Sequence, residues 1–209
     1  MTRLIEKTVP CPNCDTPVGM HIVGSTNTLG GRAADFRPVA VGVEPVAHSV
    51  HTCPACGLTG EEEVFAEELD DRLRELIAEN LTPLVRAEPP APAQRHEFAA
   101  WLAEWRGDPD GTVAQYYLSA AWCCEEPGAE ADYRRRAIAS FERALADDGL
   151  DKRDRVVFTY LVGELYRRVG DTAAAADWLG RAEALATESE ESWIASLAHR
   201  QATDPQDLI

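Results

Sequence analysis

The sequence predicts an α+β protein, in which a small β-rich module with four paired cysteines precedes an all-α stack of helical hairpins. The first 60 residues are rich in Val, Thr, Gly and Pro, a composition typical of short strands and turns. After residue 60, apolar side chains recur at the spacing of amphipathic helices. A chain of 209 residues is long enough for a small module attached to a medium-sized domain.

Residues 1–60 form the predicted module, and its best strand candidates are residues 16–23 and 46–52. Two C-x-x-C pairs accompany them, Cys11-Pro-Asn-Cys14 and Cys53-Pro-Ala-Cys56. Two residues between the cysteines let a tight turn aim both sulfurs at one ion, and Gly57 can adopt the positive φ that closes the second turn. The pattern is typical of a ribbon-like module with two zinc knuckles.

We therefore expect one structural Zn²⁺ per chain, bound by Cys11, Cys14, Cys53 and Cys56. Tetrahedral coordination by four thiolates leaves no open position for a substrate. His21, His48 and His51 are alternative ligands, because they lie close to the cysteines in the sequence. Since neighbouring strand residues point to opposite faces and four cysteines already suffice, the cysteines are favoured.

Residues 61–106 are expected to hold connecting helices. One amphipathic helix is indicated by the spacing of Phe65, Leu69, Leu73, Leu76 and Leu81, and Thr82-Pro83 is expected to end it. The proline-rich residues 82–92 are then predicted to form a linker. A second helix is indicated by Phe98, Trp101, Leu102 and Trp105, and residues 107–111, Gly-Asp-Pro-Asp-Gly, break it.

Residues 112–202 are expected to form two helical hairpins and a C-terminal capping helix around residues 193–198. In the second hairpin, Gly163 and Tyr166 stand at a small and an aromatic position of the first helix, and Gly170-Asp171 makes the turn. The second helix carries Ala175, Leu179 and Ala182. This hairpin resembles a tetratricopeptide repeat, and the preceding one matches it with a longer turn at residues 125–130. An irregular helical bundle is the alternative.

The tetratricopeptide resemblance implies a binding surface. Tyr160, Glu164 and Arg167 match positions that often face the concave side of such repeats. There they would contact a peptide or the tail of another protein. Plain helix surface is the alternative interpretation of these three residues.

The chain also resembles the bacterial proteins grouped as domain of unknown function 2225. The resemblance runs through Arg32, Asp35-Phe36, Pro38, Gly42, Pro45 and Val50 to Cys53-Pro-Ala-Cys56-Gly57. It implies a zinc module followed by tetratricopeptide-like helices, and it implies no particular activity. Arg37 stands where this family usually has a cysteine, and Ala47-His48 where it usually has two aromatic residues.

Within that stretch, Asp35-Phe36 has two interpretations. It is either a functional signature of the family or, as we favour, an aspartate that caps a turn beside a phenylalanine packed over the zinc. Small zinc modules need such packing for stability.

The formal net charge of −16 is unevenly distributed. Residues 1–60 are neutral, whereas residues 61–209 hold 32 acidic and 16 basic side chains. This excess repels phosphate backbones and anionic membrane surfaces, so nucleic acid and membranes are unlikely partners. The sequence has neither a run of about 18 apolar residues nor a signal peptide, and we expect a cytoplasmic protein.

These features together favour a non-enzymatic, zinc-stabilised adaptor that binds a protein or peptide through its helical-repeat surface. One alternative is a zinc ribbon associated with nucleic acid or the transcription machinery. A second alternative is a zinc enzyme in which a histidine takes part.

Overall fold

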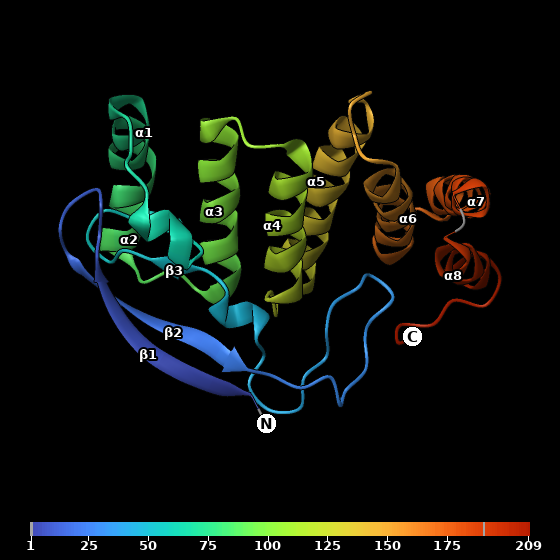
Figure 1. Cartoon of the computed structure of the whole chain (residues 1–209), viewed down its shortest axis with the longest axis horizontal. Helices are drawn as coiled ribbons and strands as arrows, with labels where there is room; N and C mark the ends of the chain where they lie inside the picture. The colour runs from blue at the N-terminus through green and yellow to red at the C-terminus, as the bar shows by residue number, and fades with distance from the viewer. Residues whose placement is uncertain (1, 190) are drawn as a thin grey trace.

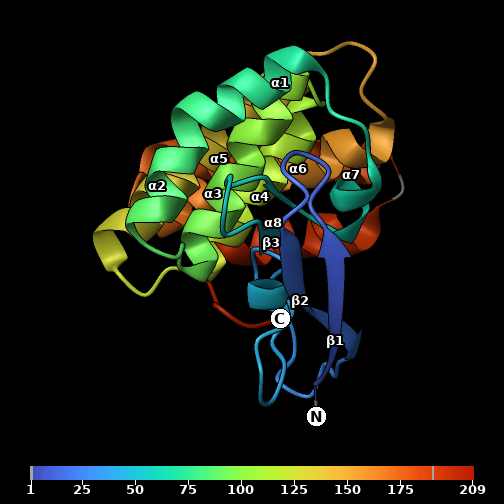
Figure 2. The ribbon, with the colours of Figure 1, turned by 90° about the vertical axis from the view of Figure 1, so that its left-hand side faces the viewer.

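A computed structural model describes residues 2–189 and 191–209 and shows an α+β fold. A long hairpin, β1 (Arg3–Pro10) and β2 (Pro17–Ser25), forms one two-stranded antiparallel sheet. A much shorter pair, β3 (His51–Thr52) and β4 (Thr59–Gly60), forms the other. Most helices stand side by side in a row, and the long hairpin runs across the ends of the N-terminal ones (Figure 1). Turned by 90°, the hairpin projects away from the helical layer (Figure 2).

Each C-x-x-C turn closes one of these hairpins. The pairing of β1 with β2 runs from Arg3 opposite Ser25 to Pro10 opposite Pro17, so the first knuckle is the loop between them. The second knuckle joins β3 to β4 in the same way. Both pairs of cysteines therefore leave the ends of antiparallel strands, which sets the direction of their side chains.

The strands were predicted in part. β2 matches the predicted strand at residues 16–23, but β1 was not predicted, because most of its side chains are exposed and no alternating apolar face marks it. The strand expected at residues 46–52 is wrong. Val46–His48 is a 3₁₀ turn, η1, and only His51–Thr52 is extended. The reason is tertiary, since Arg95 donates a hydrogen bond to the carbonyl of Ala47.

The connecting region differs from its prediction at the proline. The helix starts at α1 (Asp71–Leu76), passes through a π-helical turn, η3 (Ile77–Leu81), and continues as α2 (Thr82–Ala87). Thr82-Pro83 therefore does not end it. A π turn before the proline accommodates the missing N–H, and Thr82 Oγ1 donates to the carbonyl of Ile77 at 3.3 Å. Before this helix, Phe65 lies in a separate 3₁₀ turn, η2 (Glu62–Ala66).

The predicted linker at residues 82–92 is accordingly wrong. Its first half is helical, and only Glu88 to Ala91 separate α2 from α3 (Pro92–Arg106). The predicted break after α3 is confirmed: Gly107 ends the helix with φ of 74°.

The remaining helices follow as two hairpins and a last helix. They are α4 (Asp110–Trp122), α5 (Pro127–Leu145), α6 (Lys152–Arg168), α7 (Thr172–Glu188) and α8 (Ser192–Thr203). The turn between α4 and α5 is shorter than predicted. The Glu126 carboxylate accepts the N–H groups of Gly128 and Ala129 at 3.1 and 2.6 Å and so starts α5 at Pro127.

Gly163 shows how closely α6 and α7 approach each other. A Cβ atom at this position would lie 2.9 Å from the backbone nitrogen of Leu179. Only glycine fits there, as the repeat pattern at Gly163 and Leu179 requires. The tetratricopeptide assignment as such stays a prediction.

Two hydrophobic cores meet in α3. The first surrounds the cysteines and extends through Phe65 to Phe98 and Leu102. The second fills the hairpins of α4 to α8 and includes Ala100 and Ala103 on the other side of α3. Trp101 packs against both cores. The β-rich residues therefore have no core separate from the connecting helices.

Candidate metal centre

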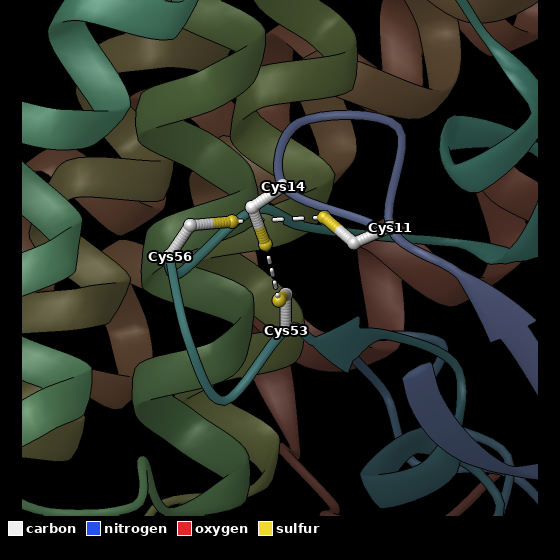
Figure 3. Close-up of side chains that lie close together, drawn as sticks. All are labelled: Cys11, Cys14, Cys53 and Cys56. Atoms are coloured by element: carbon white, nitrogen blue, oxygen red, sulfur yellow. Dashed lines mark hydrogen bonds between the residues drawn. The ribbon is translucent and has the colours of Figure 1, made fainter. Parts of the chain in front are cut away.

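The four predicted cysteines converge on one point between the two knuckles (Figure 3). Cys11 Sγ lies 3.6 Å from Cys56 Sγ, and Cys14 Sγ lies 3.6 Å from Cys53 Sγ. All four sulfurs lie within 4.8 Å of one another. Tetrahedral zinc with bonds of about 2.3 Å requires sulfur pairs about 3.8 Å apart. The cluster thus has the size of a tetrathiolate site and could hold a metal ion.

The backbone of each knuckle follows the same path. The N–H groups of Cys14 and Asp15 both bond to the carbonyl of Cys11, and the N–H of Gly57 bonds to the carbonyl of Cys53. The residue after the second cysteine has positive φ in both turns: 59° at Asp15 and 86° at Gly57. The expectation for Gly57 is confirmed, and Asp15 takes the same conformation without being glycine.

The thiols are not equivalent in the absence of a metal. A hydrogen bond from Cys11 lowers the pKa of the Cys56 thiol to about 5, despite its burial. The same bond, together with burial, raises the pKa of Cys11 above its ordinary value. Burial also raises the pKa of Cys53. The Cys56 thiolate forms easily here, whereas Cys11 and Cys53 deprotonate more readily beside a cation, which is the condition that a bound metal supplies.

Helix 71–87 holds both knuckles in place. Arg74 donates to the carbonyls of Pro12 and Asn13 at 3.1 and 3.3 Å, so α1 is tied to the first turn. Thr82 Oγ1 donates to the carbonyl of Cys56 at 2.8 Å and ties α2 to the second. Sequence reasoning missed both residues, because polar side chains on a helix carry no signal of a contact made across the fold.

No histidine joins the cysteine cluster among the described residues. His21, His48 and His51 instead line a separate cavity of about 210 Å³ together with Arg95. Burial and the nearby Arg95 charge lower the pKa values of His48 and His51. The structure therefore brings the three alternative ligands together, but away from the sulfur cluster.

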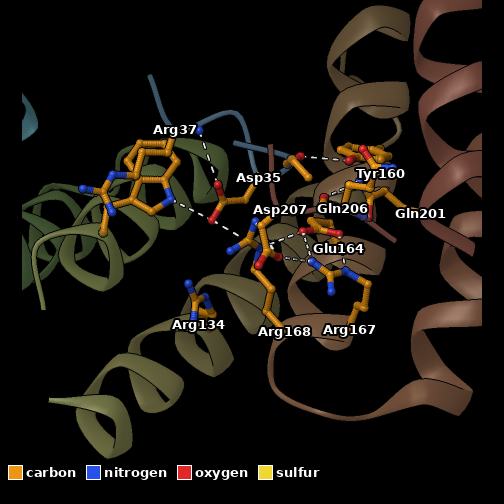
Figure 4. A network of polar contacts seen from close by, with 12 residues as sticks. Asp35, Arg37, Arg134, Tyr160, Glu164, Arg167, Arg168, Gln201, Gln206 and Asp207 are labelled. Carbon is orange, nitrogen blue, oxygen red and sulfur yellow. Dashed lines mark hydrogen bonds and ion pairs between the residues drawn. The ribbon is translucent and has the colours of Figure 1, made fainter. Parts of the chain in front are cut away.

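The residues expected on an open groove lie elsewhere. Tyr160 and Glu164 are fully buried, so the prediction that they form an exposed partner-binding surface is wrong. Tyr160 donates to the carbonyl of Ala34 at 2.8 Å, and Glu164 accepts hydrogen bonds from Arg167 and Arg168 at 2.7–2.9 Å (Figure 4). The chain's own segments cover this face of α6.

Asp35 and Phe36 lie at the centre of the segment that covers this face of α6. Asp35 is buried, accepts the indole N–H of Trp122 at 3.0 Å and lies 3.6 Å from Arg168 Nε. Its carboxylate also accepts the N–H of Arg37 at 3.4 Å, in agreement with the predicted turn cap. The expectation that Phe36 packs over the zinc is wrong. Phe36 stacks on Tyr160, with ring centroids 5.1 Å apart.

Arg37, at the position where the resemblance led us to expect a cysteine, has a structural partner. Its guanidinium binds Glu44 at 2.7 Å and lies beside Trp122 and Cys123.

Within the described residues, no helix is long and apolar enough to cross a membrane.

Of three comparisons with known proteins, one gives a match. A search of the curated proteins and a search of the solved structures found no match to the chain. A family model does match residues 4–204, which is nearly the whole chain. The matched range includes the four cysteines, Asp35 and the helices α1 to α8. The chain therefore belongs to the family described as "Uncharacterized protein conserved in bacteria (DUF2225)".

Proposed function

We propose that this protein is a non-enzymatic adaptor, stabilised by one structural zinc ion, whose helical stack binds an extended peptide of a protein partner. The observation that carries the proposal is that one face of the stack already holds two segments of the same chain, which pair with each other through an antiparallel bridge. The net charge of −16 disfavours nucleic acid as the partner.

The zinc assignment follows from the donor set. Four thiolates are soft ligands, and a compact tetrahedral arrangement of sulfur is typical of zinc or of iron–sulfur chemistry. The paired 3.6 Å separations suit a single ion, and the buried surroundings suit a closed site.

Elemental analysis of protein purified without added metal tests this assignment, alongside Cys11→Ser and Cys53→Ser variants. We expect one zinc per chain, lost in both variants together with thermal stability. Another metal, or zinc retained by Cys53→Ser, would contradict the shared site.

The peptide-binding surface is formed by α6 and its neighbours. Two segments of the chain meet there in a short antiparallel bridge between Ala33 and Leu208, joined by hydrogen bonds from Ala34 N to Asp207 O and from Ile209 N to Arg32 O, both 2.9 Å. Tyr160 anchors the first segment. Main-chain bonding of this kind is how an extended peptide adds to a folded surface.

The second segment is the one that a partner would replace. The Asp207 side chain is 79% exposed, and its carboxylate accepts a hydrogen bond from Arg167 at 3.1 Å. Leu208 and Ile209 are exposed as well. Few buried contacts therefore oppose the release of residues 206–209. Arg167, the third predicted partner residue, would then bind an acidic side chain of the incoming peptide.

A chain ending at Pro205 tests the proposal. A labelled peptide of residues 204–209 should bind this shortened protein saturably in fluorescence anisotropy, because it restores the missing hydrogen bonds. The same peptide with Asp207→Asn should bind at least about fivefold more weakly, since a charge-assisted bond is lost.

The full chain is the control, because its own segment fills the site and should exclude the peptide. If the shortened protein keeps its helicity and its zinc but binds neither peptide, the groove is not a peptide site and the adaptor proposal fails.

A further inference from the structure

A second candidate site lies apart from the cysteine cluster. It is the cavity of about 210 Å³ that η1, β2, β3 and α3 surround. Its polar wall consists of His21, His48, His51 and Arg95, and its apolar wall includes Val85, Pro89 and Pro90. Segments from four separate parts of the chain meet here.

Arg95 gives the cavity an uncompensated positive charge. It donates one hydrogen bond, from Nη2 to the carbonyl of Ala47 at 2.9 Å, and forms no ion pair with any described residue. Its Nε is buried without a partner. In a chain with net charge −16, a half-buried arginine without a carboxylate partner is unexpected, because burying an unpaired charge costs free energy.

His51 adds a second unsatisfied group. The residue is only 5% exposed, lines the cavity, and forms no hydrogen bond through its ring with the described residues. Its ring nitrogens are not among the fully buried unpaired atoms of the described residues, so they face the open space of the cavity, where a ligand can reach them.

The third element is the position of His48. Arg95 and His96 bind the carbonyls of Ala47 and Val46, at 2.9 Å each, and so fix η1 against α3. This places His48 with its ring centroid 6.2 Å from that of His21, in an edge-on arrangement. His21 is exposed, with its side chain 58% accessible, and His51 is buried, so the rings run from the mouth to the base.

We propose that this cavity binds a small oxyanion-bearing ligand with a compact apolar body, held by Arg95 and by the imidazole N–H groups of His48 and His51. Arginine and imidazole donors together recognise carboxylate or phosphate oxygens. The valine and the prolines contact the apolar body. The volume is below the roughly 300–1,000 Å³ of sites for drug-sized ligands, so the ligand is small.

A cation is a poorer match for the same residues. Within the described part of the chain, the three histidines do not form a group that could hold a metal ion, as the four cysteines do. The guanidinium of Arg95 would also repel a metal ion at this point.

The histidine Hε1 resonances of the zinc-loaded full chain provide the test. Inorganic phosphate and benzoate serve as separate probes, with sodium chloride at matched ionic strength as the reference. We expect one or both probes to shift His48 and His51 saturably, while His199 on α8 stays unchanged. Benzoate alone would identify a carboxylate on an apolar body, and phosphate alone a phosphate group.

Arg95→Gln should weaken the binding of the effective probe at least about tenfold, because a hydrogen bond to a charged group is lost. Arg86→Gln is the matched control, since Arg86 is exposed on the neighbouring α2 and forms no ion pair with the described residues. His48 is half-buried, and its side chain forms no hydrogen bond with the described residues. His48→Asn should therefore weaken binding without loss of fold.

Unchanged histidine resonances with both probes would overturn the proposal, and so would equal shifts of all five histidines. An unaltered affinity in both Arg95→Gln and His48→Asn would do the same. Binding of a second zinc ion that is lost in His48→Asn would replace the anion site by a metal site. None of these results bears on the peptide groove, which uses other residues.

Discussion

Among the described residues, two other than glycine have left-handed backbone conformations, and both lie at structural junctions. Asp15 has φ of 59° and closes the first knuckle. Phe36 has φ of 68° and turns its ring onto Tyr160 and Trp193. Such conformations cost about 1–2 kcal/mol in an L-residue, so surrounding contacts must hold them. At Asp15 the strain accompanies the cysteine turn, and at Phe36 it accompanies entry into the helical stack.

Gly57 has a second constraint besides its φ of 86°. A Cβ atom there would lie 2.7 Å from the Cβ of Leu81, where the π turn passes the knuckle. Gly57→Ala should therefore lower the free energy of unfolding by about 2–4 kcal/mol, combining left-handed strain with overpacking. Urea unfolding of the zinc-loaded protein measures this loss in the free energy of unfolding.

Gly170→Ala is its matched control. Gly170 also has φ of 86°, but a Cβ atom there meets nothing within 4 Å. This variant should lose only about 1–2 kcal/mol, the backbone part alone. Equal losses in the two variants would mean that the contact with Leu81 does not matter.

Tyr160→Phe should cost about 1–2 kcal/mol, because the carbonyl of Ala34 loses its buried donor. Tyr166→Phe removes a hydroxyl that binds the Glu142 carboxylate at a partly exposed position of the same helix, and should cost about 0.5 kcal/mol or less. Thermal unfolding compares the pair. A Tyr160→Phe protein as stable as the control would show that Ala34 is not anchored by this bond.

At the scale of elements, helix 71–87 is the part that joins the metal centre to the rest. Its first segment reaches one knuckle through Arg74, its π turn packs against Gly57, and its last segment reaches the other knuckle through Thr82. A regular helix would present these groups with a different rotation, since a π turn changes the phase of the residues that follow. The π turn therefore sets the spacing between Arg74 and Thr82, the two residues that bind the knuckles.

Arg74→Gln should loosen zinc, because the first knuckle loses the donor to its carbonyls. Removal of groups around a metal's ligands commonly costs about tenfold in affinity, so a chelator should extract zinc at correspondingly lower concentration. Arg72→Gln, on an exposed position of the same helix, should behave as the parent protein. Identical zinc retention in both variants would contradict the role of Arg74 in holding the first knuckle.

At the scale of the whole molecule, α3 is shared between two cores. Phe98 and Leu102 face the cysteines, Ala100 and Ala103 face the helical hairpins, and Trp101 contacts both. The segment that contains Asp35 adds a second connection, because it leaves the β-rich region and packs under α4 and α6. Two connections of this kind make a cooperative unit.

Zinc removal should consequently destabilise the whole chain. We expect one calorimetric transition for the zinc-loaded protein, and after chelation a fall of about 10 °C or more in Tm, since a structural zinc contributes directly to folding. Two transitions, of which the upper one is unaffected by the chelator, would show that α4 to α8 fold independently of the metal centre.

The sequence by itself determined the features that depend on local spacing. The cysteine cluster follows from two C-x-x-C turns, the positive φ of Gly57 from the position that closes one of them, and the break at Gly107 from its C-cap role. The close contact at Gly163 follows from the helical-hairpin pattern. In each case the responsible residues lie within one turn or one hairpin, so their chemistry is readable along the chain.

Only the tertiary structure decided which surfaces are covered. Tyr160 meets Ala34 across 126 positions of sequence, and Trp122 meets Asp35 across 87, so no local pattern could show that the expected groove is filled. The 3₁₀ turn at Val46–His48 and the cavity beside it depend likewise on Arg95 from α3. Hydrogen bonds between distant segments do not follow the helical period of the sequence, and they form both the covered face of α6 and the cavity beside η1.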